Sequence, residues 1–319
     1  MRRLQLNLAH GNVFALTTVV VASLARVLGL PASAPLAVRA AALLLLAVCG
    51  AGCGAILNIA IEQLAFRPFG NQRAAFGPLI ATVGLSFLLF QAAIHWRATF
   101  LPSPTGAPRP HHGAPDVPLL SMPELLPAVE LGWGGVSFTL KDALVLLLGA
   151  AVAAGVAALL ARTRSGRLLR AVAQDPELTE LSGGDPARAQ TFAFALAGAL
   201  AGFGAAIFAA YYGGASVQHG LRGGLAAMTA PVLGRVGDPR GALLGGLALG
   251  IFGSFSDYLL DAQWTPVLLM LLLVGLLALR PRGLLGREQT AASEDVSAAS
   301  ATAAPRTRVG SGAVLALLP

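Results

Sequence analysis

The sequence contains little charge. Only 12% of its 319 residues are Asp, Glu, Lys or Arg, whereas 55% are apolar and the mean hydropathy is +0.71. A soluble globular protein carries about twice that charged fraction. Several apolar segments of about 20 residues recur along the chain, and each is long enough to cross the roughly 30 Å hydrocarbon core of a bilayer. The composition therefore predicts an all-α, polytopic integral membrane protein with about seven membrane-spanning or broken-helix segments.

Lysine is almost absent, since Lys141 is the only one among 22 cationic residues. A P-loop needs Gly-Lys-Ser/Thr, but Lys141 lies between Leu140 and Asp142, so this motif for ATP binding is missing. The formal charge of +7 comes from arginines that lie singly or in small groups beside apolar segments, as the positive-inside rule describes. Because no basic stripe is interleaved with aromatic residues, we expect no nucleic-acid partner.

Sites for covalent, metal or ion chemistry are also scarce. Cys49 and Cys53 lie one helical turn apart without a neighbouring histidine, which favours packing over a disulfide or a metal site. Apart from terminal arginines, no interior of a predicted span holds an unpaired Asp, Glu, Lys or Arg, whereas ion-coupled carriers usually need such groups. Protease motifs are missing too. We therefore expect no enzyme activity, no bound cofactor and no metal, and any uphill transport would take its energy from another subunit.

The pattern of apolar and charged segments predicts the membrane topology. Segment 62–75 is expected to be a cytoplasmic loop, 213–228 a short or broken helix, and 231–240 a charged turn. The proline-rich segment 99–138, with Arg109 as its single arginine, is expected outside the cell. We interpret the first apolar segment as a membrane span rather than as a secretory signal that is cleaved near residues 32–34. The predicted spans are 7–30, 36–61, 76–96, 139–160, 191–212, 241–258 and 264–279. Residues 288–319 form a low-complexity tail that we expect to be disordered, or the stub of a longer fused chain.

A charged segment from Arg162 to Asp185 interrupts this apolar pattern. Asp175-Pro176-Glu177 and Asp185-Pro186 are typical helix starts, and Gly183-Gly184 is a typical helix end. The segment is therefore predicted to form one short helix before Asp175 and a second over 176–182. Its apolar side chains need a partner protein, the membrane surface or the chain's own loops: they are Leu168, Leu169, Val172, Leu178 and Leu181.

From about Leu6 to Gly286 the chain resembles the membrane permease subunits of bacterial branched-chain amino acid ABC importers. The most specific likeness is to the family's ATPase-coupling loop, and Leu6–Gly11 resembles its Asn-Phe-Ala-His-Gly signature. The segments that carry the resemblance are 6–11, 62–68, 78–84, 165–175 with Gly183, 227–234, 241–246 and 280–286.

The resemblance implies a function and a set of partners. Residues 1–287 would be the permease domain, in the bacterial inner membrane and in contact with lipid, and 162–190 its cytoplasmic coupling loop. A second related permease, cytoplasmic ABC ATPases that hold ATP and magnesium, and an extracytoplasmic solute-binding protein would complete the importer. The solute would be leucine, isoleucine or valine, although similar permeases carry urea, amides or other amino acids.

The same resemblance implies the functional residues. The ATPase-coupling loop would use Ser165, Gly166, Arg167, Arg170, Ala171, Gln174, Asp175 and Gly183. The family signature near the translocation path would be Asn7, His10, Gly11 and Thr229.

Some residues depart from the family pattern. The sequence begins almost at the signature, where the family has a further membrane helix, so either the true start lies upstream of Met1 or the chain lacks that first helix. Asn12 replaces the usual Glu, and Pro176 and Ser182-Gly183-Gly184 are unusual in the coupling loop. Two alternatives to an ABC permease are therefore kept. One is a truncated, non-transporting membrane assembly protein, and the other is a secondary carrier without an ATPase.

Overall fold

The computed structural model describes residues 7, 9–29, 31, 34–69, 77–100, 120–127, 129–133, 136–217, 219–234, 239–260 and 263–279. The expected tail 288–319, most of the proline-rich segment and the motif at 280–286 lie outside these residues. The elements are α1 (His10–Leu28), α2 (Leu36–Ile61), the π-helix η1 (Glu62–Phe66), the 3-10 helix η2 (Arg67–Phe69), α3 (Gly77–Phe100), β1 (Leu120–Ser121), β2 (Glu130–Trp133), β3 (Val136–Thr139), α4 (Leu140–Arg162), α5 (Arg164–Gln174), α6 (Pro176–Leu181), α7 (Pro186–Tyr212), β4 (Gly214–Ala215), α8 (His219–Gly234), α9 (Pro239–Leu259) and α10 (Thr265–Leu279).

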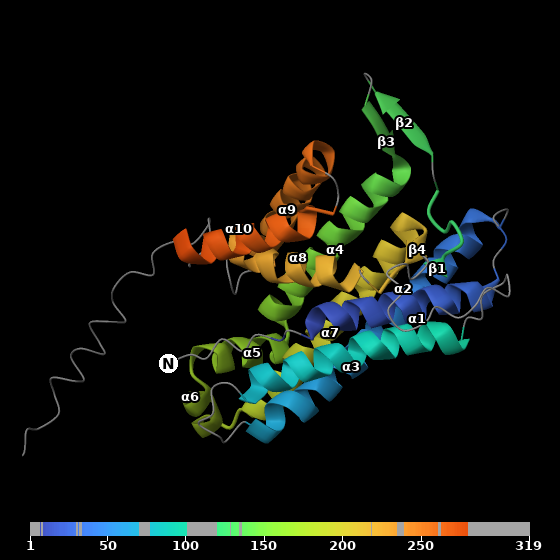
Figure 1. Cartoon of the computed structure of the whole chain (residues 1–319). Helices are drawn as coiled ribbons and strands as arrows, with labels where there is room; N and C mark the ends of the chain where they lie inside the picture. The colour runs from blue at the N-terminus through green and yellow to red at the C-terminus, as the bar shows by residue number, and fades with distance from the viewer. Residues whose placement is uncertain are drawn as a thin grey trace, which may run out of the picture.

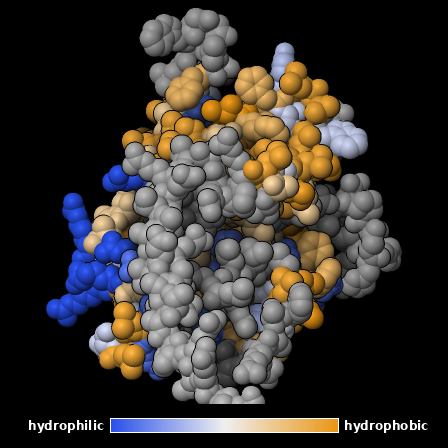
Figure 2. All heavy atoms as spheres, turned by 90° about the vertical axis from the view of Figure 1, so that its left-hand side faces the viewer, coloured by the Kyte–Doolittle hydropathy of each residue, from blue (hydrophilic) through white to orange (hydrophobic). Residues whose placement is uncertain are grey.

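Six helical segments of the described chain are long and apolar enough to cross a membrane: α1, α2 together with η1 and η2, α3, α4, α7 and α9. A shorter apolar helix, α10, follows them. On the face shown in Figure 2, apolar side chains dominate the described surface and hydrophilic ones gather on one side. Apolar side chains such as Leu147 and Phe87 are more than two-thirds exposed. The predicted all-α, polytopic membrane fold is therefore confirmed.

Helix α1 lies at the centre of the bundle. It packs against α2, α3, α7 and α8 (Figure 1), and it is the most buried of the six candidate spans. Helix α4 is the opposite case, since none of its residues is buried within the chain. It runs between the β2–β3 hairpin at one end and α5 at the other (Figure 1). It also contacts α9 and α7, so a few neighbours hold it although it is largely exposed.

Glycines hold α2 against α7. A Cβ atom added to Gly202 would lie 1.9 Å from the carbonyl oxygen of Gly50, and one added to Gly198 would lie 2.2 Å from that of Gly54. Any larger residue would force the two backbones apart. Gly50 and Gly54, like Gly198 and Gly202, lie four residues apart, a spacing that suits close helix packing, and the two pairs pack against each other.

Some predicted boundaries differ from the structure. Residues 62–69 of the expected loop 62–75 are helical, as a π-helix followed by a 3-10 helix, and Glu62 is buried. Residues 70–75 lie outside the described part of the chain. A short or broken helix is expected within 213–228, and the structure has β4 followed by the 16-residue helix α8, which runs through Pro231 to Gly234. Helix α8 thus takes up the first residues of segment 231–240, where a charged turn is expected, and residues 235–238 lie outside the described part of the chain. A proline can lie inside a membrane helix when neighbouring helices support it. Helix α7 begins at Pro186 with Asp185 as its cap, as the Asp185-Pro186 pair predicts, so the helix extends five residues before the predicted span 191–212.

Short strands were not predicted at all. Leu120 pairs with Ala215 and Ser121 with Gly214, and β2 and β3 form an antiparallel hairpin. The β1–β4 pair attaches the segment after α3 to the end of α7. Ordered structure therefore replaces part of the predicted loop.

Candidate functional site

Two short helices, α5 and α6, form the predicted coupling loop between the spans α4 and α7. Thr163 fixes the start of α5, because its hydroxyl accepts from the Gly166 N–H at 3.0 Å and donates to the Leu159 carbonyl at 2.7 Å. One residue thus satisfies a free donor at the start of α5 and a free acceptor at the end of α4.

Gly166 lies where α5 crosses the end of α4. It is buried, and a Cβ atom there would lie 2.4 Å from the carbonyl oxygen of Leu159 and 2.5 Å from that of Leu160. Backbone atoms cannot yield as a flexible side chain can. The glycine is therefore required by the tight corner between the span and the coupling loop.

Arginine side chains bind the last carbonyl groups of α4. Arg167 donates to the Arg162 carbonyl at 3.2 Å, and Arg170 donates to the Ala161 carbonyl at 3.4 Å. A helix C-terminus carries free carbonyls and partial negative charge, so cations there are favourable. These two residues hold α5 in a defined direction relative to α4.

The two turns that follow have the predicted helix caps. The Asp175 carboxylate accepts from the Leu178 N–H at 3.0 Å, with Pro176 in the first turn of α6. Gly183 has a φ of +82°, its N–H donates to the Glu180 carbonyl, and the Gly184 N–H donates to the Thr179 carbonyl. This pattern is a Schellman motif, which needs glycine at the left-handed position.

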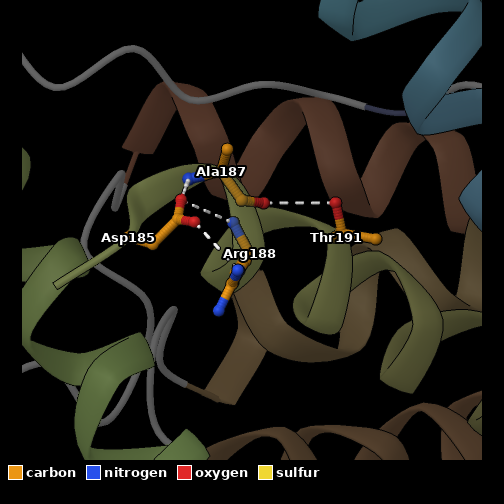
Figure 3. A network of polar contacts seen from close by, with 4 residues as sticks. All are labelled: Asp185, Ala187, Arg188 and Thr191. Carbon is orange, nitrogen blue, oxygen red and sulfur yellow. Dashed lines mark hydrogen bonds and ion pairs between the residues drawn. The ribbon is translucent and has the colours of Figure 1, made fainter.

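Asp185 then starts α7. Its Oδ1 accepts from the N–H groups of Ala187 and Arg188 at 3.0 and 3.1 Å, while its Oδ2 lies 3.1 Å from Nε of Arg188 (Figure 3). Each end of α6 is therefore joined to its neighbouring helix through a capped turn.

The coupling loop is exposed along most of its length. Gly166 is buried, and the other seven predicted coupling residues are exposed: Ser165, Arg167, Arg170, Ala171, Gln174, Asp175 and Gly183. The apolar residues divide into two groups. Leu168, Leu169 and Val172 are half-buried, whereas Leu178 and Leu181 on α6 are 62% and 85% exposed. Helix α6 therefore presents two leucines outward.

The predicted signature residues lie at the start of α1 and on α8. Asn7 donates to Oδ1 of Asn58 at 3.4 Å, and Gly11 packs so closely on α8 that a Cβ atom would lie 2.6 Å from the Gly220 carbonyl oxygen. His10 is half-buried. Thr229 is fully buried, and its hydroxyl donates to the Leu225 carbonyl of its own helix. Asn7 and Gly11 thus join helices.

Sequence reasoning missed a set of buried polar residues between α2 and α7. Asn58 is 1% exposed and donates to the Phe194 carbonyl at 3.1 Å, and Glu62 is 2% exposed. The Thr191 hydroxyl lies 3.2 Å from Oε2 of Glu62 and 3.1 Å from the Ala187 carbonyl oxygen, so its proton has two acceptors. A signal was available, because Gly50, Gly54, Asn58 and Glu62 recur every four residues and so share one helix face.

An open groove lies beside this contact. It has a volume of about 490 Å³ and runs between η2 and the first turns of α7. Its lining residues are Arg67, Asp185, Ala187, Arg188, Thr191, Phe192 and Ala195.

The opposite end of α4 has its own link to α7. The Tyr211 hydroxyl donates to Oδ1 of Asp142 at 2.5 Å, and Nζ of Lys141 lies 5.1 Å from the centre of the Tyr211 ring. Asp142 also forms a capping box with Thr139 at the start of α4. The single lysine of the chain therefore lies against an aromatic ring, with a carboxylate beside it.

Comparison with known proteins decides the family. Residues 3–279 match the family model described as branched-chain amino acid transport system / permease component. The chain belongs to this permease family. The family likeness stated from the motifs is thereby confirmed, and it covers all the described helices from α1 to α10.

Individual relatives agree with the family. The chain is 30% identical over 292 residues to the high-affinity branched-chain amino acid transport system permease protein BraD of Pseudomonas aeruginosa, covering 89% of this chain and 87% of BraD. It is 28% identical over 230 residues to the permease protein LivH of Escherichia coli, covering 72% and 70%. It is 27% identical over 233 residues to LivH of Salmonella typhimurium, with the same coverage. No solved structure matches the chain.

These findings fix the class of this permease. It is a transport subunit and a multi-pass protein of the inner membrane. As an ABC permease it belongs to a system that also contains ATPase and binding-protein subunits.

Proposed function

We propose that this permease imports leucine, isoleucine and valine in an ATP-driven uptake system and forms the translocation path with a second, related permease. The names of BraD and LivH, both high-affinity branched-chain amino acid transport permeases, support the choice of solute. Urea, amides and other amino acids are the alternative solutes.

The capped pair of short helices α5 and α6 between α4 and α7 is the observation that carries the proposal. Helices α5 and α6 are capped at each turn, and side chains of α5 bind the end of α4 directly. A loop held in this way can pass a force to both spans. Leu178 and Leu181 give α6 an exposed apolar surface, and such a surface on a short, charged segment suits a protein partner.

We assign this surface to the cytoplasmic ATPase subunits. ATP and magnesium would be bound in those subunits, and this chain would bind no cofactor. The binding protein would deliver the solute at the opposite side of the membrane, near the β2–β3 hairpin. Movement of the docked ATPases would then reach α4 and α7 through the coupling loop.

Substitutions on α6 test this assignment. Leu178→Ser and Leu181→Ser remove exposed apolar surface without disturbing a cap, and we expect each to weaken ATPase binding by about tenfold. Val27→Ser at the end of α1 is the matched control, because Val27 is 80% exposed and lies on a different segment. Co-purification with candidate ATPases measures the effect. Undiminished binding by the double serine variant would contradict the assignment.

A further inference from the structure

Asn58 and Glu62 are two polar side chains that are almost completely buried, at 1% and 2% exposure. Burying a polar or charged group costs free energy unless a partner satisfies it. For both side chains the structure shows a partner on α7. Asn58 donates to the Phe194 carbonyl at 3.1 Å, and Oε2 of Glu62 lies 3.2 Å from the Thr191 hydroxyl.

The contacts continue beyond α2. Oδ1 of Asn58 accepts from Nδ2 of Asn7 at 3.4 Å, and the Asn7 Oδ1 in turn accepts from the Ala9 N–H at 3.1 Å. A series of polar contacts therefore runs from the first turns of α7, through α2, to the residues just before α1. The segment before α1 carries the signature residue Asn7, and α1 is the central helix of the bundle.

The α7 end of this series is joined to the coupling loop. Asp185 caps α7 directly after α6, and Thr191 lies less than two turns further along the same helix. A displacement of α6 reaches the first turn of α7 through this capped turn. Because a helix moves largely as one body, Thr191 on α7 then moves as well. On the other side, Glu62 is the first residue of the π-helix η1. Single π-turns inside α-helices are frequent at functional sites.

We propose that Glu62 and Asn58 are positioning residues that make α2 follow α7 when the coupling loop moves, and that Asn58 passes this movement to the Asn7 end of α1. The proposal rests on the proposed function, because a docked ATPase supplies the movement. The glycine contacts hold α2 and α7 close together, and the two polar contacts fix their register near the coupling loop.

The test uses the complete transporter in proteoliposomes and measures labelled leucine imported per ATP hydrolysed. Thr191→Val removes the hydroxyl at nearly constant volume, and Asn58→Leu removes the amide. We expect each to lower the ratio about fivefold or more, with ATPase binding unchanged. Thr191→Ser keeps the hydroxyl and should restore the wild-type ratio. Thr18→Val is the matched control, because Thr18 is fully buried and its hydroxyl donates within its own helix, to the Phe14 carbonyl.

Two further results decide the proposal. If Thr191 and Glu62 act through one contact, the Thr191→Val, Glu62→Met double variant should be no worse than the more severe single variant. An unchanged ratio in Thr191→Val and Asn58→Leu, or an equal fall in Thr18→Val, would overturn the proposal while ATPase binding persists. Failure of the unmodified chain to bind any ATPase would instead overturn the proposed function, and this inference with it.

Discussion

Gly54 and Gly198 bring α2 and α7 into backbone contact, since a Cβ atom on Gly54 would lie 2.1 Å from the Gly198 carbonyl oxygen. This contact lies one helical turn from Asn58, the first buried polar residue that joins the same two helices. Close packing and polar contact therefore follow one face of α2, and the coupling loop lies at the end of that face.

Gly198→Val should destabilise the permease. The new side chain would meet backbone atoms of α2, and overpacking of this kind typically costs about 1–3 kcal/mol. The thermal midpoint of the detergent-purified protein measures the effect. Gly149→Val on α4 is the control, because no atom beyond the backbone of its own helix lies within 4 Å of its Cβ position. Equal midpoints for the two variants would contradict the close contact.

Gly166→Ala should weaken ATPase binding although Gly166 itself is buried. Its Cβ atom would meet the Leu159 and Leu160 carbonyl oxygens, so α5 would have to turn away from the end of α4. Co-purification with the ATPases provides the measurement. Gly155→Ala, on α4 with open space around its Cβ position, should bind like the wild type. If Gly166→Ala also binds like the wild type, the corner tolerates a methyl group and the steric argument is wrong.

Asp185→Ala should loosen the first turn of α7. Loss of an N-cap costs about 1 kcal/mol, whereas Asp185→Asn keeps an oxygen that can accept from the Ala187 and Arg188 N–H groups. The ion pair with Arg188 is exposed and adds little. Hydrogen exchange of these two amides should therefore accelerate in Asp185→Ala and change little in Asp185→Asn. Equal acceleration in both variants would show that the ion pair, rather than the cap, holds the turn.

Tyr211→Phe should free the end of α4 near the β2–β3 hairpin. The Tyr211 hydroxyl donates to the Asp142 carboxylate, and a hydrogen bond to a charged group contributes about 1.5–3 kcal/mol. Faster hydrogen exchange across residues 140–145 is the expected result. Tyr212→Phe is the matched control, because the neighbouring Tyr212 is 61% exposed. Unchanged exchange in Tyr211→Phe would show that this bond does not hold α4.

The local order of the coupling loop could be predicted from its sequence. Asp175-Pro176, Gly183-Gly184 and Asp185-Pro186 each fix a helix start or end through contacts within a few residues. Helix α2 is likewise predicted with its observed bounds, 36–61, because its long apolar segment is bounded by Pro35 on one side and by Glu62 on the other.

Features that depend on contacts between distant segments were missed. A carboxylate ordinarily ends an apolar helix, so the sequence predicts Glu62 in a loop, yet Thr191, 129 residues away, gives it a partner. Pro231 opens the segment in which a charged turn is expected, yet α8 continues through it to Gly234, because neighbouring helices can support a proline inside a membrane helix. The β1–β4 pair joins residues almost a hundred positions apart, and neither strand is long enough to show an alternating pattern.

Entry of labelled leucine into a strain that lacks this gene tests both the proposed solute and the proposed ATPase-docking surface. We expect leucine entry to fall in the deletion strain, to return with the wild-type gene and not to return with the Leu178→Ser, Leu181→Ser double variant. Urea entry should be the same in all three strains. Unchanged leucine entry in the deletion strain, with urea entry lost, would contradict the account.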